Sequence, residues 1–264
     1  MSFNKRYLGA LILSPFIIFL FLGGIYLKIV ALLLSLFGMY EFYNVISKKG
    51  FKPVAILGYI AIIIYFLLNN NTDYLIYILG GLTFIALTIP VVNLKYNFSD
   101  VSVTILGFVY VGVFFSFIPL INSMEYGKYL VWLVFIASWL CDTTAYYVGR
   151  MFGKTKLCPE VSPKKTVEGS IGGLLGSAIS CGVFGFVITS YGVNISLIHY
   201  IIIGLICGVF CQFGDLVASS IKRYAGVKDY SNLIPGHGGI LDRFDSILFS
   251  AVVVFFYLRL ILGM

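Results

Sequence analysis

The chain has 264 residues, of which 60% are hydrophobic and only 11% are charged, and its mean hydropathy is +1.00. Soluble domains carry about 25% charged residues, so this composition excludes an ordinary soluble domain and predicts an integral membrane protein. The net charge of +7 does not indicate nucleic-acid binding, because the basic residues are spread over short segments between apolar runs.

Nine apolar runs approach the length of about 20 residues that a helix needs to cross a bilayer. In chain order they cover residues 7–23, 26–46, 53–69, 74–92, 101–121, 129–148, 169–190, 196–217 and 246–263. The sequence therefore predicts an all-α fold, a polytopic membrane helix bundle with about nine transmembrane helices. The first run resembles a signal peptide but lacks a cleavage site of small residues, so we expect it to remain as a helix.

The distribution of basic residues predicts the orientation. If the amino terminus lies in the cytoplasm and the helices alternate in direction, fifteen of the eighteen Lys and Arg residues fall on the cytoplasmic side. The long polar loops 149–168 and 218–245 then face the cytoplasm, where a nucleotide is available. We expect a protein of the cell (inner) membrane, with a helical scaffold over residues 1–130 that has a possible role in dimerisation, and a catalytic region over residues 131–264.

Loop 218–245 follows a helical face that carries three polar residues. Asp215, Ser219 and Lys222 are spaced i, i+4 and i+7, and Arg223 lies beside them. A carboxylate near the centre of a membrane helix costs about 2.5–3.5 kcal/mol, less near the end, and usually faces a cavity or a partner. The alternative is that Asp215 pairs with a nearby base and only ends the helix.

The same loop contains a glycine-rich turn around His237, followed by two acidic residues. Glycines allow the backbone to approach a ligand closely and to offer unblocked N–H groups. If a helix begins near Asp242, then Asp242 and Asp245 lie one turn apart, and carboxylates are ligands that suit Mg²⁺. The alternative is that the helix dipole favours acidic residues here, which could be the whole role of Asp245.

Loop 149–168 offers matching groups. Asp142 lies at the cytoplasmic end of the sixth predicted helix, and Lys164 and Lys165 stand between hydroxyl residues just before the seventh. Two lysines beside a helix amino terminus suit a phosphate site. The alternative is that these lysines set the topology or contact anionic head groups, which we favour for Lys154 and Lys156.

The sequence assigns no role to several other features, and it leaves a functional role for Glu41 open. The segment 149–155 resembles a P-loop but has one residue too few between its glycines and no preceding strand. The five cysteines show no zinc spacing and are expected to be buried hydrophobes. We expect His199 to be a satisfied core or interfacial residue, and Glu41 has no partner that the sequence identifies.

Carboxylates for a divalent metal, bases for phosphates and an apolar surround together indicate phosphoryl or nucleotidyl transfer onto a lipid. At this point a motif becomes recognisable. Its residues are Ser219, Ile221, Lys222, Arg223, Lys228, Asp229, Ile234, Pro235, Gly236, His237, Gly238, Gly239, Asp242, Arg243 and Asp245. This motif resembles the signature of the phosphatidate cytidylyltransferases (CDP-diacylglycerol synthases), and the likeness covers residues 138–245.

The resemblance implies that CTP and phosphatidate give CDP-diacylglycerol and pyrophosphate, with Mg²⁺ and a possible second cation as cofactors. It implies metal ligation by Asp215, Asp242 and Asp142, the last rather than Asp245. The other implied site residues, for catalysis or for binding phosphates and nucleotide, are Lys164, Lys165, Ser219, Lys222, Arg223, Lys228, His237, Gly238, Gly239 and Arg243. The implied partners are the two substrates, membrane lipid and a second copy of the chain, with no nucleic acid.

Two rival functions predict different features. A CDP-alcohol phosphotransferase would carry a different Asp-Gly…Ala-Arg motif, which this sequence lacks. A transporter for an anionic substrate would show paired interrupted helices in two related halves, and no such symmetry is visible.

Overall fold

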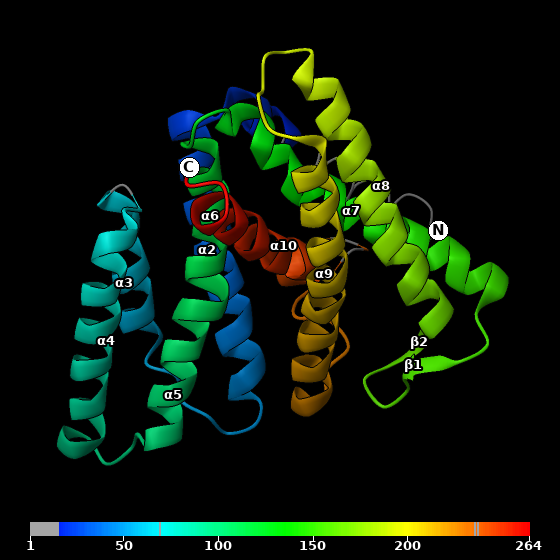
Figure 1. Cartoon of the computed structure of the whole chain (residues 1–264). Helices are drawn as coiled ribbons and strands as arrows, with labels where there is room; N and C mark the ends of the chain where they lie inside the picture. Colours follow the sequence, from blue (N-terminus) through cyan, green and yellow to red (C-terminus); the bar gives the residue numbers. More distant parts are fainter. Residues whose placement is uncertain (1–15, 69, 235, 237) are drawn as a thin grey trace. The chain divides into compact units, whose positions relative to one another are not determined.

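The structure is a computed structural model that describes residues 16–68, 70–234, 236 and 238–264 (Figure 1). It is nearly all helical and divides into two compact units. Unit 1 comprises the chain up to Leu120 together with Tyr224–Arg243, and unit 2 comprises Ile121–Arg223 together with Phe244–Met264. The predicted division at residue 130 into a scaffold and a catalytic region concerns function and stays a prediction.

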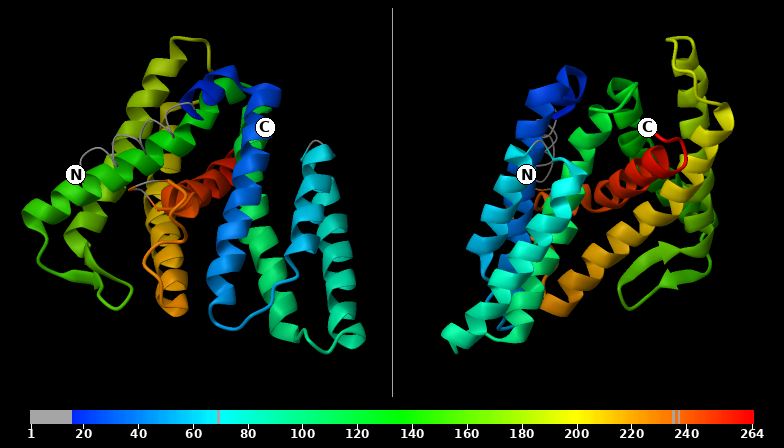
Figure 2. Two further views of the ribbon diagram at one scale, coloured as in Figure 1. Left: turned by 180° about the vertical axis from the view of Figure 1, so that it is seen from behind. Right: turned by 60° about the vertical axis from the view of Figure 1, so that its left-hand side comes forward.

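Unit 1 is built from long apolar helices. They are α2 (Gly24–Ser47), α3 (Ala55–Leu67), α4 (Thr72–Val92) and a continuous helix made of α5 (Phe98–Gly107), the π-helical η1 (Phe108–Val113) and α6 (Phe114–Asn122). Helix α2 packs on α3 and η1, and α3 packs on α4 (Figure 2). Gly107 lies directly against the ring of Tyr43, where a side chain would collide, so α2 and α5 approach closely.

The helices of unit 1 differ in how much of their surface they bury. In its most apolar stretch, α4 buries only 11% of its residues, whereas the continuous helix Phe98–Asn122 buries 67%. Side chains such as Ile76, Tyr77 and Phe84 are more than two-thirds exposed on α4. An apolar helix with this exposure suits contact with lipid, and Phe98–Asn122 forms the centre of the unit.

Unit 2 is organised around one pair of helices. Its elements are α7 (Gly127–Phe152), β1 (Lys156–Cys158), β2 (Ser162–Thr166), α8 (Val167–Thr189), most of α9 (Leu197–Ala225) and most of α10 (Leu241–Leu260). Helices α7 and α8 lie side by side over much of their length (Figures 1 and 2). A Cβ on Gly169 would come within 2.8 Å of the Ala145 carbonyl oxygen, and one on Gly176 would collide with Thr144. Small residues thus allow the two backbones to approach, as in many membrane helix pairs.

The polar loops contain secondary structure that the sequence did not predict. Strands β1 and β2 form a small antiparallel hairpin within loop 149–168, so the all-α prediction misses a two-stranded sheet. Helix α9 continues to Ala225, beyond the predicted end at residue 217, and α10 begins at Leu241 rather than at 246. These extensions are polar, and a prediction based on apolar length stops where the hydrophobic run stops.

The predicted count of nine transmembrane helices is not confirmed. Among the described residues, six helices are long and apolar enough to cross a membrane: Gly24–Ser47, Thr72–Val92, Phe98–Asn122, Gly127–Phe152, Val167–Thr189 and Leu197–Ala225. The apolar helix Ala55–Leu67 is shorter, and α10 carries several charged residues in its 20 residues. The predicted helix 7–23 lies mostly outside the described residues. The chain is a multi-helix membrane protein.

Candidate active site

A cavity of about 360 Å³ lies in unit 2 where α7, α8, α9 and strand β2 meet. Its charged lining residues are Asp142, Arg150, Lys164, Lys165 and Asp215. Three of these residues are bases and two are carboxylates, from segments far apart in the sequence. The structure therefore brings Asp142, Asp215 and both lysines of the predicted phosphate site to one cavity, and it adds Arg150, which the sequence did not single out.

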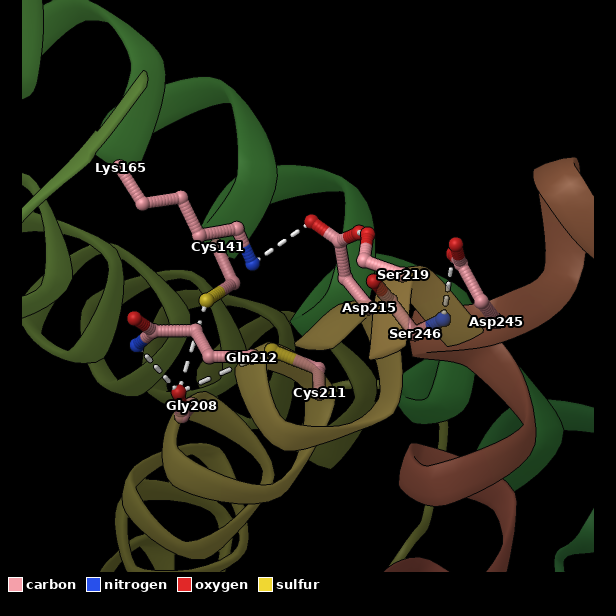
Figure 3. A network of polar contacts seen from close by, with 9 residues as sticks. All are labelled: Cys141, Lys165, Gly208, Cys211, Gln212, Asp215, Ser219, Asp245 and Ser246. Carbon is pink, nitrogen blue, oxygen red and sulfur yellow. Dashed lines mark hydrogen bonds and ion pairs between the residues drawn. The ribbon is translucent and has the colours of Figure 1, made fainter. Parts of the chain in front are cut away.

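Lys165 and Asp215 form an ion pair across this cavity. The Lys165 amino nitrogen lies 2.6 Å from the Asp215 Oδ2 atom, and the two side chains are 23% and 32% exposed (Figure 3). Ser219, one turn further along α9, donates its hydroxyl to Asp215 Oδ1 at 3.2 Å. Asp215 and Ser219 thus lie on one helical face as predicted, and Asp215 also pairs with a base, but it does not end the helix, because α9 continues to Ala225.

A glycine brings α9 and α10 together beside this carboxylate. A Cβ on Gly214 would lie 2.5 Å from the Asp245 carbonyl oxygen and 2.9 Å from the Phe249 ring. Because no side chain separates the two helices here, Asp215 and Asp245 come into electrostatic range. Burial, followed by the Asp215 charge, raises the pKa of Asp245 to about 7, although the Ser246 N–H group and Lys222 act in the opposite direction.

The carboxylates of Asp142, Asp215 and Asp245 therefore interact, each from a different helix. Within the described part of the chain, no group of three or more His, Cys, Asp or Glu side chains is close enough to hold a metal ion. Asp215 is turned toward Lys165 and Ser219, whereas Asp245 accepts the N–H of Ser246 (Figure 3). The metal site predicted from Asp142, Asp215 and Asp242 stays a prediction.

Asp242 belongs to unit 1 and organises its own loop. Its Oδ2 atom accepts the N–H groups of Tyr230 and Gly239, both at 2.8 Å, and the residue is only 9% exposed. Gly238 has a φ of 82°, and a Cβ there would lie 2.8 Å from this oxygen. The glycine-rich turn is thus wrapped around the Asp242 carboxylate. Because α10 begins at Leu241, the condition that a helix starts near Asp242 is met, and Asp245 follows one turn later on α10.

The remaining predicted site residues are distributed between both units. In unit 2, Lys222 is 9% exposed, and Arg223 donates its Nε–H to the Val161 carbonyl oxygen at 3.4 Å. In unit 1, Lys228 and Arg243 are exposed. His237 lies outside the described residues.

Two further expectations concern residues away from the cavity. The Nδ1 atom of His199 lies 2.9 Å from the Tyr257 hydroxyl, so this histidine is satisfied as predicted. The N–H groups of Lys154 and Thr155 both donate to the Glu168 carboxylate at 3.1 Å, so they are occupied where a P-loop would offer N–H groups to phosphate. This geometry agrees with the rejection of the P-loop.

Glu41 is the polar residue for which the sequence offered no partner. Its carboxylate is 2% exposed and accepts hydrogen bonds from Ser231, Ile240 and Leu241, all in unit 1. These partners follow about 190 residues later, so no local pattern could have connected them. The only sequence signal was a carboxylate within an apolar helix.

Comparison with known proteins identifies the family. Residues 4–261 match the cytidylyltransferase family. The chain belongs to this family. It is 38% identical over 250 residues to a protein of Staphylococcus haemolyticus and 34% identical over 256 residues to one of Bacillus subtilis, both named phosphatidate cytidylyltransferase. Each match covers 92% of this chain and 94% of the relative. The family match also includes residues 4–130, which the motif alone did not cover.

Proposed function

We propose that the protein transfers the cytidylyl group of CTP to phosphatidate, giving CDP-diacylglycerol and pyrophosphate. Its membership of the cytidylyltransferase family, with relatives of that name over 92% of the chain, supports this substrate pair. The observation that carries the proposal is the cavity of unit 2, in which Arg150, Lys164 and Lys165 face Asp142 and Asp215. A site that joins two phosphorylated substrates needs bases to offset their negative charge.

The proposed reaction is a displacement at phosphorus. A phosphate oxygen of phosphatidate attacks the α-phosphorus of CTP, and the bond from that phosphorus to the oxygen bridging to the β-phosphate breaks. The electron pair of this bond leaves with pyrophosphate. Because the lipid phosphate is already anionic at neutral pH, no strong general base is required, and the main barrier is the repulsion between two anions.

Basic residues of the chain lower this barrier in the proposal. Lys164, Lys165 and Arg150 line the cavity and would bind the phosphate oxygens of CTP and of the leaving pyrophosphate. Lys222 and Arg223 follow Asp215 on α9 and are proposed to contact phosphates from that helix.

The other motif residues are proposed to bind nucleotide. The Gly238–Gly239 turn offers close backbone approach, and His237 is proposed to shape the same pocket. Ser219, Lys228 and Arg243 complete the proposed binding set.

We propose that Mg²⁺ is the cofactor, held by Asp142, Asp215 and Asp242, and that a second cation is an option. The donor chemistry fits, because carboxylate oxygens are the preferred protein ligands of Mg²⁺. Burial first, and then the charges of Asp215 and Asp142, raise the pKa of Asp245, and this proximity of three carboxylates supports adding Asp245 to the proposed ligands. When bound, the ion would offset negative charge on the phosphates.

We also propose the membrane arrangement. Nine spans with a cytoplasmic amino terminus would place loops 149–168 and 218–245 at the cytoplasmic side of the cell (inner) membrane, where CTP is present. The strong bias of basic residues toward that side supports this orientation. A homodimer formed through the first 130 residues is a further proposal.

Purified protein in detergent with labelled CTP, Mg²⁺ and phosphatidate tests the function. We expect labelled CMP to become linked to lipid, EDTA to stop the reaction, and Asp215→Asn and Asp242→Ala to lower turnover by about 10²-fold or more while leaving membrane insertion intact. A lack of lipid-linked product from the wild-type protein would reject the proposed activity. In a separate measurement without CTP, Mg²⁺ at 100 times its dissociation constant is expected to stabilise the protein by about 2.7 kcal/mol, and no thermal shift would reject the metal site.

A further inference from the structure

Glu41 is a buried carboxylate in the middle of an apolar helix. It lies in α2, one of the helices long and apolar enough to cross a membrane, and it is 2% exposed. The cavity beside it is about 580 Å³ in volume and otherwise lined mainly by apolar and aromatic side chains, including Leu36, Phe37 and Tyr59. A charged group in such surroundings is costly unless protein groups replace its lost hydration, so its partners indicate its role.

Those partners all belong to the segment that leads into α10. The Oε1 atom of Glu41 accepts the Ser231 hydroxyl at 2.6 Å and the Ile240 N–H at 2.9 Å. The Oε2 atom accepts the Leu241 N–H at 2.9 Å. In the part of the chain that the structure describes, no ion pair to Glu41 is found, so these three donors are its recorded partners.

Leu241 is the first residue of α10, so Glu41 caps that helix from another part of the chain. The first N–H groups of a helix have no partner within it, and the helix dipole favours a negative charge at this end. A cap normally comes from a side chain just before the helix. Here it comes from a residue 200 positions earlier.

The space around Gly239 is a second observation that supports the contact between Glu41 and the start of α10. A Cβ on Gly239 would lie 2.5 Å from Glu41 Oε1, so any larger residue would displace the carboxylate from its present position. On the other side, the Gly239 N–H donates to Asp242 at 2.8 Å. The segment is therefore held between two carboxylates, and the backbone that carries Asp242 has little freedom.

We propose that Glu41 is a positioning residue for the reaction: it fixes the first turn of α10 and so the direction in which Asp242 is presented. The inference rests on the proposed function, in which Asp242 is a metal ligand. Glu41 itself does not touch substrate in this proposal, because its oxygens are occupied by backbone and hydroxyl donors. Catalytic groups displaced by about 1 Å lose up to about 10²-fold in rate, so a small shift of this turn is sufficient to matter.

Asp100 provides a matched control in the same unit. Its carboxylate is fully buried, accepts the N–H groups of Lys52 at 2.7 Å and Asn97 at 2.9 Å, and caps α5. Asp100→Asn and Glu41→Gln therefore both weaken a buried carboxylate cap, but only Glu41 bonds the segment that carries Asp242. A purely structural role predicts similar effects from the two substitutions.

The experiment compares wild type, Glu41→Gln, Asp100→Asn and the milder Ser231→Ala in detergent. We expect both carboxylate variants to lower the unfolding temperature, but only Glu41→Gln to reduce kcat by about tenfold or more and to raise the Mg²⁺ concentration for half-maximal activity. Ser231→Ala, which removes one of three donors, should give a smaller change in the same direction. If Glu41→Gln retains kcat and the Mg²⁺ requirement of Asp100→Asn, Glu41 only stabilises the fold and the proposal is overturned.

Hydrogen exchange of peptides covering residues 228–245 gives a readout that does not depend on activity. Exchange should become faster in Glu41→Gln and stay at the wild-type rate in Asp100→Asn. Unchanged exchange in Glu41→Gln overturns the proposed positioning even if the enzyme assay succeeds. If wild-type protein transfers no CMP while the exchange result holds, the proposed activity fails and the cap on α10 is nevertheless supported.

Discussion

One substitution in the ion pair between Lys165 and Asp215 can show whether Lys165 serves mainly to stabilise the fold or to bind substrate. The paired atoms are 2.6 Å apart, and the side chains keep 23% and 32% of their surface exposed. Pairs with this access to water contribute about 0.2–1 kcal/mol, because hydration and lost side-chain freedom offset the attraction. Lys165→Met should therefore cost at most about 1 kcal/mol, or about 2–4 °C in unfolding temperature for a chain of this size.

The effect on activity is expected to be much larger. A hydrogen bond from a charged group contributes about 1.5–3 kcal/mol, which corresponds to a loss of about 10- to 150-fold in kcat/KM for CTP if Lys165 binds phosphate. Lys156→Met is the control. Lys156 lies in the same hairpin and is exposed, but it does not line the cavity. Steady-state kinetics and thermal unfolding of both variants decide the outcome. A large loss of stability in Lys165→Met with kcat/KM unchanged would mean that the pair is structural.

Three glycine substitutions, one of them a control, test the packing that positions the acidic residues. Gly214→Ala introduces a Cβ 2.5 Å from the Asp245 carbonyl oxygen, and such overpacking costs about 1–3 kcal/mol, so both unfolding temperature and CTP turnover should fall. In the control Gly80→Ala, the added Cβ would meet no atom within 4 Å, so the unfolding temperature should be unchanged or raised. Equal unfolding temperatures of Gly214→Ala and Gly80→Ala would contradict the expected overpacking. Gly239→Ala should reduce turnover because its Cβ would lie 2.5 Å from Glu41 Oε1, and wild-type kinetics in this variant would show that the carboxylate can move without consequence.

The sequence predicted the helices best where hydrophobicity alone determines them. The runs that became α2, α4, α7 and α8 are long and almost uncharged, and their observed limits lie within a few residues of the predicted ones. Prediction was poorer for the polar extensions of α9 and α10 and for the β1–β2 hairpin. These segments make contacts between distant residues, such as the hydrogen bond from Arg223 to Val161, and no periodicity in the sequence reveals such contacts.

In the candidate site, too, the sequence predicted local relations between residues but not contacts between different helices. Spacing on one helix was sufficient to place Asp215 and Ser219 on a common face, because helix geometry is local. The approach of Asp245 to Asp215 depends on Gly214, which has no signature beyond the absence of a side chain. Sequence reasoning left two roles open for Asp245, a ligand of Mg²⁺ beside Asp242 or an acidic residue favoured by the helix dipole, and it could not show the electrostatic coupling to Asp215 on another helix.

Glu41 shows the same limit over a longer distance in the sequence. From the sequence of α2 alone, Glu41 is a charged residue with no identified partner. The structure identifies its partners, Ser231, Ile240 and Leu241, which are distant in the sequence. A carboxylate that caps a helix by backbone contacts can recognise almost any sequence at that helix start, so the partner residues carry no complementary pattern apart from Gly239. The requirement for glycine there follows from the position of the Glu41 carboxylate rather than from backbone conformation, because Gly239 is not among the residues with positive φ. A motif glycine near an active site can therefore report a contact with a remote buried charge, and in this chain that contact connects the amino-terminal helices to the turn that presents Asp242.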